Sequence, residues 1–389
     1  MRKICAFAAP GAELFIVHLF TLCQIGEQRL ASRVEKFMRA VLLHGHGGFD
    51  QLEYRDDVPV PKPALGEVLI RIGAAALNNT DINMRIGWYS KSVASASGSP
   101  SGGAVANPQD SNWTGVAVIF PRIQGADACG RIVAVGEDID TARVGQRVLV
   151  NPVLCSGTGV PGDTSYFGSD RDGAFADFAT VPAVNACNIT SKLTDVELAS
   201  FPCSYGAAEN MLTRARVRAG ESVLVTGASG GVGSAAVQLA RRRGANVIGV
   251  ASASKAPVVT SLGAVKILGR EADFIRELGR ESVDAVIDVV GGRAFPQLLQ
   301  VLKRGGRYAV AGAIAGPTVE LDLRTLYLKD LRLLGCTVLD PEVFGNLISY
   351  IERGEIRPVV SAIYPMSEIV AAQAEFLTKA HAGKIVLTP

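Results

Sequence analysis

The pattern of hydrophobic and polar positions divides the chain into two main parts. In residues 38–190, short apolar runs alternate with polar positions and are separated by Gly and Pro, as in GEVLIRIGAAAL (66–77), CGRIVAVG (129–136) and GQRVLV (145–150). An alternation of period two between turn residues is typical of β-strands. The first part is therefore expected to be a mainly β domain, such as a partly open barrel.

In residues 191–338, apolar strand-like runs alternate with stretches of helical spacing. SVLVT (222–226) leads into a helix-like stretch from Gly231 to Arg243, and NVIGV (246–250) follows it. Later strand-like runs are VKIL (265–268), AVID (285–288) and RYAVAG (307–312). This order of strands and helices predicts a doubly wound parallel sheet, and so an α/β fold class.

Two other segments depart from these patterns. Residues 91–112 are rich in Ser, Gly and Ala with little apolar content, which predicts a flexible loop or insertion. Residues 339–389 predict a helix, a short strand near 359–363, a second helix and a last strand, KIVLT (384–388). We expect this tail to return to the β-rich domain and complete it.

The first 37 residues suit neither domain. Two basic residues precede a mostly apolar stretch from Ile4 to Ile25, which resembles a secretory signal peptide. Glu13 and His18 interrupt the stretch, no convincing small-residue cleavage site follows, and a membrane-spanning helix needs a longer unbroken apolar run. We interpret residues 1–37 as an N-terminal extension outside the fold, which then opens at Met38.

Length, charge and cysteine content narrow the class of protein. A chain of 389 residues is long enough for two domains, and 48% hydrophobic with 20% charged residues is typical of a soluble globular protein. A net charge of +2 gives no reason to expect a nucleic acid or a membrane surface as partner. Seven widely spaced cysteines, an odd number without a CxxC pair, argue against a disulfide framework and favour the reducing cytoplasm.

A glycine-rich turn carries the clearest chemistry. The strand at 222–226 runs directly into it, and a predicted helix follows. Such a turn lets the backbone approach a diphosphate closely, and the helix N-terminus presents free N–H groups to it. The candidate dinucleotide-binding residues here are Gly227, Ser229, Gly230, Gly231, Val232 and Gly233.

The choice between NAD and NADP is argued from a missing carboxylate. NAD sites usually place Asp or Glu about 20 residues after the turn, where it binds the ribose hydroxyls. No Asp or Glu occurs between Gly233 and Arg270, and the second strand of the sheet ends in ASASK (251–255). Ser252 and Lys255 can bind the 2′-phosphate of NADP, so we predict NADPH over NADH. The alternative is that Lys255 is simply an exposed lysine.

From residue 38 to residue 389 the chain resembles the medium-chain dehydrogenase/reductase superfamily. The segments that carry the resemblance are ALNNTDINMRIG (76–87), QGADACGRIVAVG (124–136), VTGASGGVG (225–233), VDAVIDVVGG (283–292), LKRGGRYAVAG (302–312) and GKIVL (383–387). The resemblance implies a GroES-like catalytic domain at 38–190, a Rossmann domain at 191–338, and a C-terminal return to the catalytic domain at 339–389.

The zinc-binding pattern of the superfamily is incomplete in this sequence. Zinc-dependent relatives carry Cys-His-Thr-Asp where this chain has Asn78-Asn79-Thr80-Asp81, and Gly-His-Glu where it has Gly125-Ala126-Asp127. The third ligand position is still a cysteine, Cys203, which we interpret as a small buried residue. Because a catalytic zinc needs three protein ligands, the resemblance points to the zinc-free, quinone oxidoreductase-like branch.

That branch implies roles for several residues. Asn78 would help to hold the nicotinamide end of the cofactor, and Tyr89 would donate a hydrogen bond or a proton to the substrate. Thr80 falls where metal-dependent relatives place a proton-relay hydroxyl. Further cofactor-binding residues implied by the resemblance are Gly312, Ala313, Ile314 and Lys384.

The predicted function is NADPH-dependent hydride transfer to a quinone or an α,β-unsaturated carbonyl compound without a metal. Two alternatives remain open: a zinc-type alcohol dehydrogenase with a degenerate metal site, and a non-catalytic NADPH-binding protein. The expected partner is a small electrophilic substrate. A homodimer is expected through LRLLGCTV (331–338), a plausible edge strand, because dimers of this superfamily often join their Rossmann sheets edge to edge.

Overall fold

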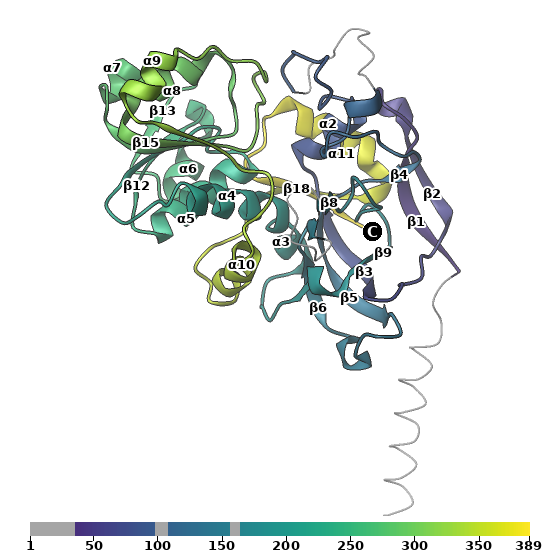
Figure 1. Ribbon diagram of the computed structural model, residues 1–389. Helices are drawn as coiled ribbons and strands as arrows, with labels where there is room; N and C mark the ends of the chain where they lie inside the picture. The colour runs from purple at the N-terminus through teal and green to yellow at the C-terminus, as the bar shows by residue number, and fades with distance from the viewer. Residues whose placement is uncertain (1–35, 98–107, 156–163) are drawn as a thin grey trace, which may run out of the picture.

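The computed structural model describes residues 36–97, 108–155 and 164–389, which form two lobes (Figure 1). The proposed extension 1–37, apart from its last two residues, lies outside the described part of the chain. So do residues 98–107 of the expected 91–112 insertion. Among the described residues, no helix combines the length and apolar character that crossing a bilayer requires.

The first lobe is built from antiparallel strands. Its small sheet pairs β1 (Phe37–Leu43) with β2 (Leu52–Pro59) and β4 (Arg122–Ile123). Its larger sheet has the order β10-β6-β5-β3-β18-β17, with β9 also on β3. The bounds are β3 (Glu67–Ala76), β5 (Asp127–Val135), β6 (Arg147–Val150), β9 (Phe178–Pro182), β10 (Ala186–Asn188), β17 (Val360–Pro365) and β18 (Lys384–Thr388). A separate hairpin joins β7 (Val153–Cys155) to β8 (Thr164–Tyr166).

The C-terminal segment completes the first lobe. Strand β18 pairs antiparallel with β3, with Val386 opposite Ala76, and parallel with β17. Helix α11 (Ile369–Thr378) comes between β17 and β18 in sequence and lies near α2 (Asn79–Arg85) in the first lobe (Figure 1). The side chains of Arg85 and Gln373 join these two helices by a hydrogen bond of 2.9 Å.

The second lobe is a six-stranded parallel sheet of order β13-β12-β11-β14-β15-β16. Its strands are β11 (Ser222–Val225), β12 (Asn246–Val250), β13 (Lys266–Leu268), β14 (Val283–Asp288), β15 (Leu302–Val310) and β16 (Arg332–Gly335). Helices accompany it: α4 (Pro202–Arg214), α5 (Gly231–Arg242), α6 (Ala256–Leu262), α7 (Phe274–Leu278), α8 (Phe295–Val301), α9 (Leu323–Leu328) and α10 (Val343–Glu352). Helix α3 (Asp195–Ala199) instead contacts β3 and β5 of the first lobe. The predicted α/β class, with a mainly β unit and a doubly wound parallel sheet, is confirmed.

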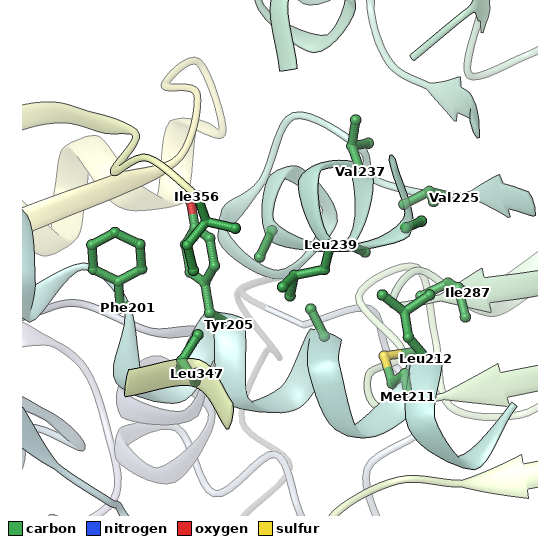
Figure 2. Close-up of a cluster of buried hydrophobic side chains, with 14 of the residues drawn as sticks. Phe201, Tyr205, Met211, Leu212, Val225, Val237, Leu239, Ile287, Leu347 and Ile356 are labelled. Carbon is green, nitrogen blue, oxygen red and sulfur yellow. The ribbon is translucent and has the colours of Figure 1, made fainter. Parts of the chain in front are cut away.

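The continuous apolar run of β11 follows from burial on both faces of this sheet. Val223 and Val225 belong to one hydrophobic cluster and Leu224 to another, as expected for side chains that alternate across a covered parallel sheet. Figure 2 shows the first cluster, to which Tyr205 of α4 and Leu239 of α5 both belong. The Tyr205 hydroxyl donates to the Arg357 carbonyl at 2.6 Å, so its polar end is satisfied within the core.

Candidate active site

Residues from both lobes line one cleft, with a cavity of about 390 Å³. Helix α2, the glycine-rich turn, the turn after β15 and the segment before β18 all contribute to its wall. The predicted site residues that line it are Asn78, Thr80, Tyr89, Gly227, Gly230, Gly231, Val232, Gly233, Gly312, Ala313, Ile314 and Lys384. The other predicted residues, Ser229, Ser252 and Lys255, are not part of the lining.

The glycine-rich turn connects β11 to α5 and has little space for side chains. Gly227 has a φ of +56°, and a Cβ on Gly233 would lie 2.1 Å from the Gly227 carbonyl oxygen. Helix α5 begins at Gly231 without a side-chain cap on Gly230, so its first N–H groups are available to a ligand. This geometry fits the diphosphate of a dinucleotide, which the backbone can approach closely.

A buried polar network lies beside the turn. The Lys384 ammonium donates to Asp127 Oδ2 at 2.8 Å and to Asn78 Oδ1 at 2.6 Å. Asn78 Nδ2 donates to the same Asp127 oxygen at 2.9 Å, and the backbone N–H of Cys203 donates to Asp127 Oδ1 at 2.6 Å. Both carboxylate oxygens of Asp127 are therefore engaged by protein donors.

Tyr89 follows α2 and lines the cleft. Burial raises the pKa of its hydroxyl to about 12, although hydrogen bonds with Thr80 and Asn83 oppose the rise. The hydroxyl therefore keeps its proton at neutral pH and can donate it or a hydrogen bond to a ligand. Tyr89 and Thr80, two of the predicted catalytic residues, therefore face the same cleft.

Comparison with known proteins identifies the family. Residues 64–191 match the alcohol dehydrogenase GroES-like domain, and residues 231–353 match the zinc-binding dehydrogenase domain. The chain is 31% identical to acryloyl-coenzyme A reductase of Metallosphaera sedula over 90% of its own length and 100% of that protein. The chain belongs to the medium-chain dehydrogenase/reductase superfamily. It is therefore an oxidoreductase, and the superfamily uses nicotinamide cofactors.

Two further members of the superfamily bear on its chemistry and fold. Human quinone oxidoreductase is 27% identical, covering 91% of this chain and 98% of that enzyme. The solved structure of a putative alcohol dehydrogenase from Sinorhizobium meliloti 1021 is 46% identical, with a TM-score of 0.84, and covers 93% of this chain and 99% of that one. The GroES-like and Rossmann architecture predicted from the resemblance is confirmed.

The superfamily's zinc-ligand positions do not form a metal-binding set in this chain. They hold Asn78, Ala126 and Cys203, and Asp127 beside them is already engaged. Burial, reinforced by the Asp127 charge, raises the pKa of the Cys203 thiol, so it does not readily become the thiolate that binds zinc. Within the described ranges, no three His, Cys, Asp or Glu side chains lie together in a way that could hold a metal ion.

Aromatic side chains form part of the cleft wall. Of these, the sequence had indicated only Tyr89. The rings of Trp88 and Tyr89 meet edge to face with centroids 5.7 Å apart, and Trp113 stacks on Tyr166 at 4.1 Å. Trp88 and Trp113 are the only two tryptophans of the chain, and both line the cleft. Their proximity in sequence to Tyr89 and to the 91–112 segment was the signal that could have pointed to them.

The residues predicted for the 2′-phosphate lie beside the cleft, after β12. The Lys255 ammonium donates to the Lys379 carbonyl at 2.6 Å, and the hydroxyls of Ser252 and Ser254 lie 3.2 Å apart. Burial and then the charge of Arg270 lower the pKa of Lys255, which indicates a second cation nearby. Lys255 is thus largely buried and engaged, in contrast to the exposed lysine of the alternative interpretation.

Proposed function

We propose that the chain is an NADPH-dependent reductase that transfers a hydride to a quinone or an α,β-unsaturated carbonyl compound without a metal ion. The engagement of Asp127 by Lys384, Asn78 and the Cys203 N–H carries this proposal. These contacts occupy the donor atoms next to the position where zinc-dependent relatives bind their metal.

Because the proposed mechanism uses no Lewis acid, only acceptors that take up a hydride readily are expected to react. Simple alcohols and carbonyls need a polarising metal or a strong acid, whereas quinones and conjugated carbonyls accept a hydride readily. The nicotinamide, when bound, supplies the hydride. The protein's part is then to hold donor and acceptor together and to exclude water, with Tyr89 donating a proton or hydrogen bond to the acceptor oxygen.

The shape and lining of the cleft support this division of roles. The turn from Gly227 to Gly233 would hold the diphosphate, and the turn at 312–314 would lie beside the nicotinamide. Trp88 and Trp113 give the remaining wall a flat, apolar surface that suits a conjugated acceptor. The names of two relatives, quinone oxidoreductase and acryloyl-coenzyme A reductase, describe acceptors of these two kinds.

NADPH is proposed over NADH because the end of β12 carries positive and no negative charge. A carboxylate there would repel a 2′-phosphate, and the stretch from residue 234 to residue 270 has none. Lys255 and Arg270 provide two cations there. A bound 2′-phosphate would replace the Lys379 carbonyl as the partner of Lys255, so that an ionic contact replaces a neutral one.

The proposal is tested by following NADPH and NADH oxidation with a benzoquinone, an enone, an enoyl-CoA and a saturated aldehyde. Turnover of the conjugated acceptors with NADPH, unchanged by a chelator, is the expected result. Chelator-sensitive oxidation of alcohols would instead identify a zinc-type alcohol dehydrogenase. Quenching or enhancement of NADPH fluorescence without turnover of any acceptor would identify a non-catalytic binding protein.

We also propose that the chain forms a homodimer through β16. This strand ends the six-stranded sheet, so its outer hydrogen-bonding groups are available to a second copy. Leu333 and Val338 are exposed there, and Val319 and Leu333 line a shallow hollow beside the strand. An exposed edge with apolar side chains favours pairing with another strand.

A further inference from the structure

Lys379 is a cleft residue with an unusual backbone conformation. It follows the last turn of α11 with a φ of +52°, in the left-handed region that side chains other than Gly, Asn and Asp rarely adopt. Its ammonium donates to Asn79 Oδ1 at 2.8 Å and lies 3.9 Å from the centre of the Phe376 ring. The left-handed backbone thus directs a long cationic side chain towards α2 and the cleft.

The Lys379 ammonium has spare hydrogen-bonding capacity and no counter-ion. An ammonium has three N–H groups, and the contact with Asn79 uses one of them. Among the described residues, no carboxylate oxygen lies within 4.0 Å of it to form an ion pair. Burial, followed by the charge of Lys255, lowers the pKa of Lys379 to about 8. A partly buried cation without a counter-ion is stabilised by a negatively charged ligand.

Lys379 belongs to the segment that passes beside the glycine-rich turn. Four residues later, Gly383 donates its backbone N–H to the Ser229 carbonyl at 2.8 Å. The next residue, Lys384, is also cationic, but Asp127 already neutralises it at 2.8 Å. Lys379 is therefore the cation on this segment whose charge is not balanced by a carboxylate.

We propose that the Lys379 ammonium binds the diphosphate of the bound dinucleotide together with the glycine-rich turn. This inference rests on the proposed function. The turn offers N–H groups but no positive charge, and the diphosphate carries two negative charges. Lys379 supplies the charge, while its own carbonyl holds Lys255 next to the 2′-phosphate end of the same cofactor.

The test variant is Lys379→Gly, because glycine adopts the left-handed backbone without strain. The variant removes the ammonium but favours the native loop, so a loss of binding cannot be attributed to misfolding. The matched control is Arg216→Gly, an exposed basic residue with a φ of +49° at the end of α4. Both variants lose one positive charge and relieve the same kind of backbone strain, but only Lys379 lines the cleft.

Fluorescence titrations with NADPH and NADH provide the measurement. Loss of one charge-assisted contact should raise the Kd of Lys379→Gly for both cofactors about tenfold, because the diphosphate is common to them. Arg216→Gly should bind both like the wild type, and Lys379→Arg should retain most of the affinity. Lys255→Ala should weaken NADPH more than NADH, since it acts at the 2′-phosphate.

Three results separate the inference from the proposed function. Unchanged Kd values for Lys379→Gly would overturn the assignment of Lys379. Weaker binding of NADPH alone would also overturn it, because that pattern belongs to the 2′-phosphate. A wild-type chain that binds neither cofactor would overturn the proposed function itself, before any variant is compared.

Discussion

The Lys384 ammonium and the Asp127 carboxylate form a buried ion pair 2.8 Å long, and less than 5% of either side chain is exposed. Asn78 contacts both partners, so one network joins the ends of three segments from distant parts of the sequence. Removing one partner of such a pair leaves a buried charge without compensation, which costs far more than losing an exposed pair.

Lys384→Met should therefore destabilise the cofactor-free protein by about 3–5 kcal/mol, measured by denaturant unfolding. Lys303→Met is the control: Lys303 pairs with Asp284 at the same distance but is 44% exposed, and its loss should cost below about 1 kcal/mol. Equal losses of stability for the two variants would show that burial does not set the strength of the Lys384 contact.

Tyr89→Phe should lower kcat with an enone about 100-fold, because it removes the proposed proton donor. The Kd for NADPH should stay close to that of the wild type. Since burial raises the pKa of Tyr89 to about 12, its ionisation should not limit the wild-type rate near neutral pH. Tyr327→Phe, a change at an exposed tyrosine, is the control; an unaltered kcat for Tyr89→Phe would rule out the role.

Purified protein should contain zinc well below one equivalent per chain, and a chelator should leave quinone reduction unchanged. The double variant Asn78→Cys/Ala126→His should increase the zinc content, because with Cys203 it restores three protein ligands. Elemental analysis measures the zinc content of the wild type and of the double variant. Stoichiometric zinc in the wild type, lost together with activity on chelation, would contradict the metal-free mechanism.

The affinity for NADPH should fall as the pH rises above 8. Lys379 has a pKa of about 8 without ligand, and a bound diphosphate favours its charged form, so binding takes up a proton. The Kd should rise roughly threefold from pH 8 to pH 9, because the charged fraction of free Lys379 decreases while a tenfold gain from its charge raises the pKa in the complex by about one.

Lys255 is the charged neighbour that acts on Lys379. His381 lies near both lysines, and burial together with these lysines lowers its pKa to about 4. His381 is therefore already neutral in this range. Lys379→Arg, which stays charged, should abolish the change in Kd, and persistence of the change in that variant would assign it to another group.

Leu333→Asp should convert the proposed dimer to a monomer, because it places a charge on the outer edge of the parallel sheet. Sedimentation velocity measures the change. Leu65→Asp, at an exposed leucine of the first lobe, should leave the dimer intact. A wild-type chain that sediments as a monomer would refute the dimer directly.

Local patterns were enough to predict the fold. The run at β11 is apolar throughout because both faces of a parallel sheet are covered, and the glycines after it meet steric limits within the same turn. The closing strand KIVLT was predicted with the bounds that the structure gives it. Such features depend on neighbours in the sequence, which a single chain reveals.

The partners of the site residues could not be predicted in the same way. Asn78 and Lys384 are separated by 306 positions, and Asn79 and Lys379 by 300. The family resemblance indicated that Asn78 stands where relatives have a zinc ligand, but not which cation it contacts. Lys379 does not belong to any of the sequence motifs that indicated the site. The proposed roles of the site residues, the domain limits and the cytoplasmic location stay predictions.

The backbone hydrogen bond between Gly383 and Ser229 joins the two lobes at the glycine-rich turn. Any rotation of one lobe against the other that preserves this bond must pivot there. The end of the cleft beside the glycine-rich turn would then move least.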